Sequence, residues 1–295
     1  MFHVGIDLGG TKIEGVVLDE SHREIFRERI ATEREHGYGH ILKQIQKLYQ
    51  SLLKNKDGRE HTLGVGTPGT FSRKTGAMIN SNTICLNGRP LAGDLEAMLQ
   101  HRLALENDAN CFAVAEALQG AGTGRRVVFG VIMGTGCGGG LVVDGKLWDG
   151  LQGIAGEWGH MIIDPSGPEC YCGKHGCVET FISGGGLERM YLRETGQTMP
   201  LREISALYRK GNEPAVKLMR SFFRNFGVAL GNLINILDPE VVVLGGGVSN
   251  IDEIYEQGLE EVRKNVFSDK FQTPVVKHRL GDSAGVLGAA WIGIA

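Results

Sequence analysis

The amino-acid sequence predicts an α/β fold built from two halves. Apolar segments with the period of a strand alternate with segments whose apolar residues recur at helical spacing. A glycine-rich hairpin pattern near the N-terminus also recurs in the middle of the chain. With 295 residues, the chain is long enough for two domains that each bury a core, and a single small domain is excluded.

The first hairpin is expected over His3 to Asp19, which reads as a strand, a glycine-rich turn and a second strand. The segment from Gly130 to Asp144 repeats this order of residues, with glycines at the turn and apolar residues in the second strand. The matched pairs, each 125 positions apart, are Gly5 with Gly130, Gly9 with Gly134, Gly15 with Gly140, Val17 with Val142 and Asp19 with Asp144. Two related halves are therefore expected.

The remaining elements follow from apolar spacing. Helices are predicted where apolar residues recur every three or four positions, and strands where a short apolar run is bounded by turn residues. The predicted helices are 41–52, 91–99, 111–118, 218–237 and 284–291, and the predicted strands are 63–66, 103–105 and 241–244. Strands and helices alternate, so the cleft between the two halves is the expected ligand site.

The charge balance of the chain disfavours nucleic acid and anionic membranes as binding partners. Lys and Arg number 31 against 34 Asp and Glu, a net charge of -3, which lacks the basic excess that nucleic acid or an anionic membrane selects. The sequence shows neither an apolar run of membrane-spanning length nor the pattern of a signal peptide at Met1. We therefore expect a cytoplasmic protein that binds a small molecule.

Three glycine-rich loops are candidates for nucleotide binding. Backbone N–H groups in such loops can approach phosphate closely because no Cβ intervenes, and a nearby carboxylate can hold Mg²⁺. The candidate residues are Asp7, Gly9, Gly10, Thr11 and Lys12 in the first loop, Gly134, Thr135, Gly136 and Gly138 in the second, and Gly245, Gly246 and Gly247 in the third. The first loop is equally explained as a hairpin that needs glycine, and the third as a plain turn after a strand. None has the pattern of a P-loop or a dinucleotide-binding loop.

Asp108 is the candidate catalytic base. It follows the apolar run 103–105 and precedes a helical run, so a helix N-cap is the competing explanation. Phosphoryl transfer to an alcohol needs a positioned base that accepts the hydroxyl proton. The side chains of Asn82, Asn107, Glu157 and Glu179 are candidates for hydrogen bonds with sugar hydroxyls.

Three of the six cysteines cluster near a histidine. His160, Cys170, Cys172 and Cys177 have the spacing H-x9-C-x-C-x4-C, and three thiolates with one imidazole form a closed tetrahedral set for structural Zn²⁺. His175 is an alternative fourth ligand. The competing explanations are a redox pair, which favours C-x-x-C, and three unrelated buried thiols. The cluster lies between Glu157 and Glu179, so a bound metal would fix both carboxylates.

Taken together, these motifs resemble the ROK family of repressors, open reading frames and kinases. The motifs are DLGGTK at 7–12, NDAN at 107–110, GTGCGGG at 134–140, GEWGH at 156–160 and CYCGKHGCVE at 170–179. The resemblance implies an actin-like (RNase H-like) fold of two domains with ATP in the cleft. The first of the two domains is expected at 1–117, joined by the helix at about 284–295, and the second is expected at 118–283. It further implies Asp108 as base, sugar contacts at Glu157, His160 and Glu179, a zinc ligand in His160, and a homodimer.

Shorter segments resemble individual branches of the family, and these resemblances predict the substrate. The segments 80–88, 157–160 and 179–184 resemble the bacterial fructokinase or manno(fructo)kinase branch, which predicts ATP-dependent phosphorylation of fructose, with mannose or glucose as further substrates. The N-acetylglucosamine kinase branch, with other amino sugars, is the alternative. A non-catalytic sugar-sensing regulator is a lower alternative, because only four residues precede Gly5 and a DNA-binding domain has no room there.

Overall fold

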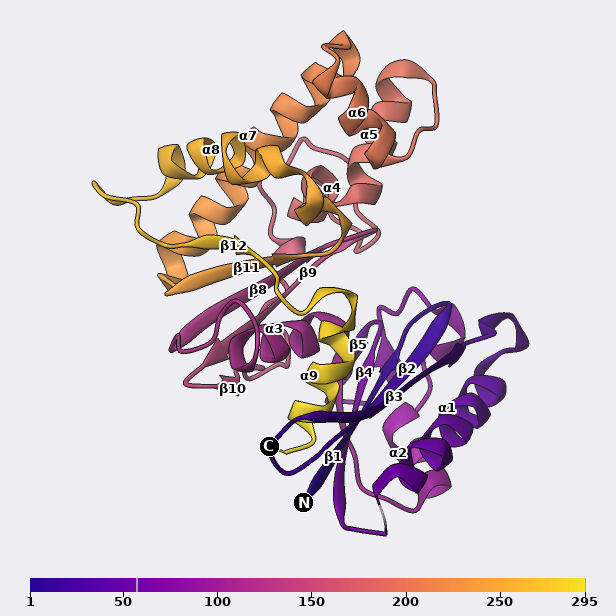
Figure 1. Ribbon diagram of the computed structural model, residues 1–295. Helices are drawn as coiled ribbons and strands as arrows, with labels where there is room; N and C mark the ends of the chain where they lie inside the picture. Colours follow the sequence, from indigo (N-terminus) through magenta and orange to yellow (C-terminus); the bar gives the residue numbers. More distant parts are fainter. Residues whose placement is uncertain (57, 295) are drawn as a thin grey trace. The chain divides into compact units, whose positions relative to one another are not determined.

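Two β-sheets lie at the centres of two units in the computed structural model, which describes residues 1–56 and 58–294 (Figure 1). Unit 1 comprises Met1–Gly120, Gly145–Ala155 and Leu280–Ala295, and unit 2 comprises Ala121–Asp144 and Gly156–Arg279. The predicted helix at about 284–295 is observed as α9 (Ala284–Ile292), and position 295 lies outside the described residues. This is the α/β architecture that the sequence predicts.

The sheet of unit 1 has the strand order β3-β2-β1-β4-β7. Its strands are β1 (Phe2–Leu8), β2 (Lys12–Leu18), β3 (Glu24–Ala31), β4 (His61–Thr67) and β7 (Ala104–Asn107). The first three pair antiparallel, whereas β1, β4 and β7 are parallel. The remaining elements of the unit are α1 (Tyr38–Leu53), α2 (Leu91–Leu99), α3 (Asp108–Leu118), α9 and the short strands β5 (Thr70–Phe71), β6 (Met78–Ile79) and β10 (Lys146–Leu147).

Helices cover both faces of this sheet. A Cβ on Gly15 of β2 would lie 2.6 Å from Leu52 of α1, whereas a Cβ on Gly5 of β1 would lie 2.4 Å from the Val286 carbonyl of α9. Gly5 pairs with Val16 and not with Gly15, and successive residues of a strand face opposite sides, so α1 and α9 lie on opposite faces. The parallel strands β1, β4 and β7 therefore end at one edge, between two helical layers.

The sheet of unit 2 contains the order β9-β8-β11-β12. Its strands are β8 (Val127–Met133), β9 (Cys137–Val143), β11 (Val241–Gly245) and β12 (Val275–Lys277), and its helices are α4 (Val178–Ile182), α5 (Gly184–Thr195), α6 (Leu201–Arg209), α7 (Glu213–Leu237) and α8 (Gln257–Asn265). Phe129 of β8 and Phe222 and Phe226 of α7 are among the largest fully buried side chains. They join sheet and helix into one apolar core.

Helix α7 begins five residues before the predicted start at Leu218. The side chain of Asn212 accepts a hydrogen bond from the Ala215 N–H at 3.3 Å, and Pro214 lies in the first turn. An asparagine cap followed by proline is a recognised helix start. The prediction began at Leu218, the first residue of the repeated apolar spacing, and the cap lies upstream of it.

The two hairpins differ by one residue at the turn. Leu8 pairs with Ile13 in the first, whereas Met133 pairs with Cys137 in the second. The matches of Gly15 with Gly140 and of Asp19 with Asp144, which assume a constant spacing of 125 positions, therefore do not describe equivalent pairing positions. The first strands of the hairpins still correspond.

Among the helices of the described residues, none combines the length and the apolar character needed to cross a membrane.

Candidate functional site

Two aspartates of unit 1 lie at the same edge of the sheet, at the ends of the parallel strands β1 and β7, which β4 separates. Asp7 is the penultimate residue of β1, and Asp108 follows the last residue of β7. Burial, and after it the negative charge of Asp108, raises the pKa of Asp7 from 3.8 to about 7. A Cβ on Gly285 in the first turn of α9 would lie 2.9 Å from Asp7 Oδ2. The sequence-predicted base and the sequence-predicted magnesium ligand therefore lie at one edge of the sheet, where the charge of Asp108 acts on Asp7.

A third carboxylate faces Asp7 across the hairpin. Glu14 pairs directly with Asp7 and is only 2% exposed. Two guanidinium groups neutralise it, because Arg27 contacts Oε1 at 3.0 Å and Arg29 contacts Oε2 at 2.7 Å. Like charges opposite each other destabilise a strand pair. The two arginines of β3 compensate the charge of Glu14, while Asp7 retains a raised pKa.

Asp108 is not the cap of α3. The N-cap is Asn107, whose Oδ1 accepts the Asn110 backbone N–H at 2.6 Å. Asp108 is the first helical residue and is exposed, whereas Ala109 and Asn110 behind it are buried. The capping explanation therefore applies to Asn107. Asn107 Oδ1 accepts one hydrogen bond at the cap, so its Nδ2 group and the second lone pair of Oδ1 are what it has to offer a sugar hydroxyl.

The first glycine turn is held from outside the hairpin. Gly9 N–H donates to the Lys12 carbonyl at 2.9 Å, and Thr32 Oγ1 donates to the Gly9 carbonyl at 2.7 Å. A Cβ on Gly10 would lie 3.1 Å from the guanidinium of Arg34. Thr11 is exposed at the tip of this turn. Asn82, the other candidate of unit 1, is exposed on a loop that follows β6.

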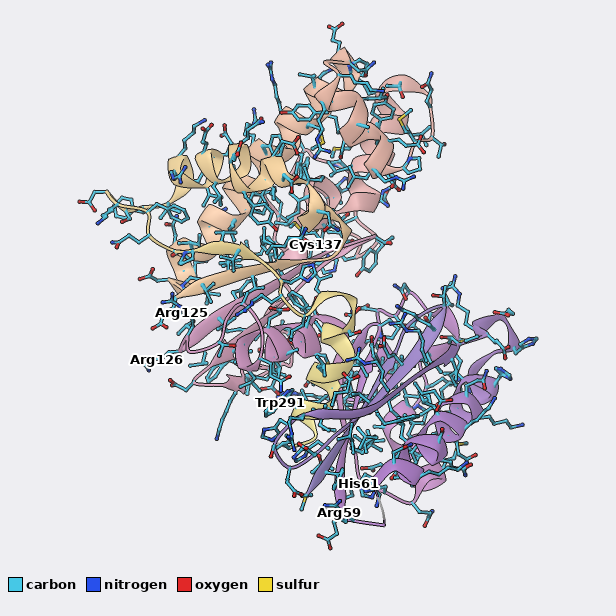
Figure 2. All side chains as sticks on the ribbon, in the orientation of Figure 1. Arg59, His61, Arg125, Arg126, Cys137 and Trp291 are labelled. Carbon is cyan, nitrogen blue, oxygen red and sulfur yellow. The ribbon has the colours of Figure 1, made fainter. Side chains whose placement is uncertain are left out.

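In unit 2 the second glycine loop contacts Glu179. Glu179 Oε2 accepts the backbone N–H of Cys137 at 2.8 Å, and Cys137 begins β9, where Figure 2 labels it. A Cβ on Gly136 would lie 2.6 Å from the same oxygen. Glu179 itself is 9% exposed and lies in the first turn of α4. The loop predicted to bind phosphate and a carboxylate predicted to bind sugar are therefore in direct contact.

The segment from Glu157 to His160 packs on the start of β9. Trp158 is buried, and its Nε1 donates to the Gly138 carbonyl at 3.1 Å. A Cβ on Gly159 would lie 2.1 Å from the Cys137 carbonyl, so only glycine permits this approach. His160 ends the short 3₁₀-helix Trp158–His160. This packing fixes the positions from which Glu157 and His160 extend.

The other predicted loop glycines differ in their surroundings. A Cβ on Gly246 would lie 2.4 Å from the Met133 carbonyl, and this glycine has a φ of +77°. Gly134 and Gly247 have no neighbouring atom within 4 Å of the place that a Cβ would take, and neither has a positive φ. Gly245 ends β11. The close approach of β11 and β8 thus accounts for Gly246 but not for Gly134 or Gly247.

The predicted zinc ligands form one cluster. His160, Cys170, Cys172 and Cys177 place their ligand atoms within 4.8 Å of one another. The distance is 3.6 Å from Cys170 Sγ to His160 Nδ1 and 3.6 Å from Cys172 Sγ to Cys177 Sγ. Zinc with Zn–S bonds of about 2.3 Å has tetrahedral edges of about 3.8 Å, so this donor set fits the ion. Burial, and then hydrogen bonds with Cys172 and Cys170, raises the pKa of Cys177 to about 12, which a bound cation would oppose.

Sequence reasoning missed Tyr171. Its hydroxyl lies 3.0 Å from His160 Nε2, on the side of the ring away from the cysteines. The side chain is 68% exposed, and burial, followed by the charges of Glu179 and Glu157, raises its pKa to about 12. Tyr171 therefore contacts His160, a residue that the sequence singled out. Its place between Cys170 and Cys172 was the available signal.

Known proteins match this chain over nearly its whole length. The sequence matches the ROK family over residues 3–295. A relative from Photobacterium profundum, named N-acetyl-D-glucosamine kinase, is 37% identical over 99% of both chains. Among solved structures, the ROK hexokinase from Thermus thermophilus has a TM-score of 0.91 at 34% identity, covering 99% of this chain and 97% of the other. A ROK family glucokinase from Streptomyces griseus, in complex with glucose and AMPPNP, has a TM-score of 0.79 at 29% identity, covering 99% of each chain.

The expectation of a fructokinase is wrong. Full-length relatives at 37% identity are named N-acetyl-D-glucosamine kinases. The segments 80–88, 157–160 and 179–184 carried the fructokinase expectation, and these short motifs do not separate the two branches. Specificity between hexoses depends on a few hydrogen bonds and on local pocket shape, which short motifs do not describe.

Proposed function

Because the chain belongs to the ROK family, we propose that it transfers the γ-phosphoryl group of ATP to a hydroxyl of N-acetyl-D-glucosamine. The substrate rests on the full-length similarity to N-acetyl-D-glucosamine kinases. The reaction rests on one geometric observation, that Asp108 is exposed at the start of α3 while Asn107 serves as the helix cap. Asp108 Oδ1 accepts the Ala109 backbone N–H at 2.9 Å, whereas the cap hydrogen bond of the helix is made by Asn107, so the exposed Asp108 carboxylate keeps further acceptor capacity for the proposed reaction.

Asp108 is the proposed general base. It accepts the proton of the attacking hydroxyl, so that the oxygen becomes nucleophilic as the bond to phosphorus forms. Its position as the first residue of α3 places it where the helix dipole stabilises negative charge. Asn107, through Nδ2, and Asn82 are the proposed partners of further sugar hydroxyls in unit 1.

Glycine loops are the proposed phosphate ligands. Gly9, Gly10, Thr11 and Lys12 offer backbone N–H groups, a hydroxyl and an ammonium group, and Gly134, Thr135, Gly136 and Gly138 offer backbone N–H groups and a hydroxyl from unit 2. Gly245, Gly246 and Gly247 are proposed to approach the nucleoside. Asp7 is the proposed ligand of Mg²⁺, which when bound neutralises phosphate charge. The raised pKa of Asp7 is consistent with this role, because an unneutralised carboxylate there is costly.

In unit 2 the proposed sugar ligands are Glu157, His160 and Glu179. The proposed zinc ligands are His160, Cys170, Cys172 and Cys177, and four protein ligands leave no open coordination position. The metal would therefore act structurally, by fixing the loop that carries His160. Nδ1 of His160 faces the cysteines, so the opposite ring edge, with Tyr171, is available to the sugar.

A coupled ADP-release assay tests the proposal. The purified protein is supplied with ATP and Mg²⁺ and, in turn, N-acetylglucosamine, glucose, fructose, mannose and N-acetylmannosamine. We expect the highest kcat/KM with N-acetylglucosamine and no ADP release when Mg²⁺ is omitted. Fastest turnover with glucose, or sugar binding by calorimetry without any ADP release, would show that the proposal is wrong.

A further inference from the structure

One arginine of unit 1 lies directly beside the first glycine turn. Arg34 begins the short 3₁₀-helix Arg34–His36, which follows β3. A Cβ on Gly10 would lie 3.1 Å from Nη1 of Arg34 and 3.7 Å from Oγ1 of Thr83. Thr83 follows Asn82, which is proposed to bind the sugar. The guanidinium therefore lies where a loop proposed to bind phosphate meets a loop proposed to bind sugar.

The backbone that leads to Arg34 is fixed to the turn. Thr32 is buried, its N–H donates to the Thr11 carbonyl at 3.0 Å, and its Oγ1 donates to the Gly9 carbonyl at 2.7 Å. Glu33 then has a φ of +51°, a left-handed conformation that residues with a side chain seldom adopt. Such strain persists only where the surrounding structure enforces it, and it is frequent at functional sites. The fold therefore sets the position of Arg34.

Among the described residues, no acid neutralises this arginine. The carboxylate of the preceding Glu33 is engaged by α1, because its Oε2 lies 2.7 Å from His40 Nε2 and accepts from Gln44 Nε2 at 3.0 Å. Within residues 1–56 and 58–294, the guanidinium of Arg34 has no hydrogen bond and no ion pair. The side chain is exposed and keeps its five N–H donors for a ligand. A guanidinium in this state beside a phosphate-binding loop is suited to a phosphate group.

We propose that Arg34 is a further catalytic residue, whose guanidinium binds the phosphoryl group that passes from ATP to the sugar. The inference rests on the proposed function. In the reaction, the sugar oxygen forms a bond to phosphorus while the bond between phosphorus and the bridging oxygen of ADP breaks. ADP leaves with the electron pair of that bond, and Asp108 receives the hydroxyl proton. Arg34 donates hydrogen bonds to the equatorial oxygens, where charge is spread in the transition state, and exchanges no proton.

The position of Arg34 selects the transferred group over the rest of the nucleotide. The γ-phosphoryl group is the part of ATP that must reach the sugar, so it is the phosphate that meets both loops. A guanidinium can bind two oxygens of one phosphate at once, in a geometry that the ammonium group of lysine does not reproduce. The binding of ADP, which lacks this group, should therefore not depend on Arg34.

Two variants test the assignment in the ADP-release assay with N-acetylglucosamine. Loss of one preorganised donor to transition-state charge lowers kcat by about 10²- to 10³-fold, and we expect a loss of this size in Arg34→Ala. Arg34→Lys keeps the charge without the planar fork, so its kcat should lie between those of the wild type and Arg34→Ala. The Kd for ADP, measured by calorimetry, should stay unchanged in both variants.

The matched control is Arg102→Ala. Arg102 is an exposed arginine of the same unit, two residues before β7, and its guanidinium has no hydrogen bond or ion pair among the described residues. Asn107 and Asp108 lie at the other end of β7, so this control should leave kcat unchanged. Because both arginines are exposed and unbonded, each alanine variant should keep its Tm within about 2 °C of the wild type.

The outcomes separate this inference from the proposed function. Absence of ADP release by the wild type with every sugar would overturn the proposed function and the role of Arg34 with it. Wild-type turnover with a loss of less than about tenfold in the kcat of Arg34→Ala would overturn the role of Arg34 alone. A Kd for ADP that rises as much as kcat falls would also overturn it, because Arg34 would then bind the nucleotide and not the transferred group. A larger loss of kcat with an unchanged Kd for ADP supports the assignment.

Discussion

Replacing Asp7 with asparagine should stabilise the folded protein at neutral and alkaline pH. Asp7 pairs with Glu14 across the hairpin and lies near Asp108. Burial, and then the charges of Asp108 and Glu14, raises its pKa from 3.8 to about 7. Asparagine has almost the same shape without the charge, so the substitution removes the cost of ionising this position. The same substitution should abolish the proposed phosphoryl transfer.

The sign and size of the effect follow from the pKa. Between pH 3.8 and about 7 the folded protein retains a proton at Asp7 that the unfolded chain has released, so folding weakens as the pH rises. Each pKa unit corresponds to about 1.4 kcal/mol, which sets a ceiling of about 4 kcal/mol above pH 7 and no effect below pH 3.8. Because Asp7 is only partly buried, we expect about 1–4 kcal/mol at pH 8. This corresponds to a Tm higher by at least about 2 °C.

Thermal denaturation at pH 5 and pH 8 measures the effect. Buffers contain neither Mg²⁺ nor ATP, because a cation at Asp7 would mask the charge, and chelators are avoided because they would strip a metal from the cysteine cluster. The matched control is Asp19→Asn in the same hairpin, where the Arg23 backbone N–H foremost lowers the pKa of the carboxyl. This control should destabilise the protein at pH 8. An Asp7→Asn protein that melts at or below the wild-type temperature at pH 8 would refute the reasoning.

The remaining predictions concern the base, the metal and the glycine loop. Asp108→Asn should lower kcat by about 10²- to 10⁴-fold with an unchanged Tm, and a variant that keeps more than about a tenth of the wild-type rate would remove Asp108 from the role of base. Cys172→Ser should reduce the zinc content, measured by plasma mass spectrometry, from about one ion per chain to none and lower the Tm; a wild-type protein purified without zinc would contradict the metal assignment. Gly136→Ala should raise the KM for the sugar at least about 10-fold by displacing Glu179. At Gly134 the space for a Cβ is open, so Gly134→Ala should leave the KM for the sugar unchanged and raise the KM for ATP.

Local patterns were sufficient to predict most elements of the fold. The hairpin glycines and the apolar spacing predicted β1, β2, β8, β9 and α1, because hairpins and amphipathic helices are specified by neighbouring residues. The start of α7 was missed because the prediction followed the apolar spacing from Leu218 and did not use the cap at Asn212. The one-residue difference between the hairpins was missed because register depends on which residues face each other, and sequence alignment alone does not reveal this.

The candidate site was predictable in its residues but not in its contacts. The motif NDAN indicated Asp108, but only the structure shows that Asn107 takes the cap and that Asn110 Oδ1 is buried without a hydrogen-bond partner among the described residues. The cysteine spacing similarly indicated the metal ligands, whereas the hydrogen bond between Tyr171 and His160 depends on the fold of the loop. The cap at Asn107 has the usual spacing of three residues, but the sequence offered both Asn107 and Asp108 for that role, and the contact of Tyr171 with His160 follows no helical or strand period.

The loop glycines of unit 2 are of two kinds, which differ in whether the protein itself occupies the space that a Cβ would need. At Gly136 and Gly246 the space that a Cβ needs is occupied by the protein itself, by Glu179 and by the Met133 carbonyl. Packing therefore explains these two glycines without any ligand. At Gly134 and Gly247 the space is open and the backbone has no positive φ, so the fold would accept alanine. The close approach of a nucleotide is the requirement that we propose for the open positions. A substitution that is harmless to folding but raises the KM for ATP is its direct signature, and of these four glycines only the two open ones allow such a substitution.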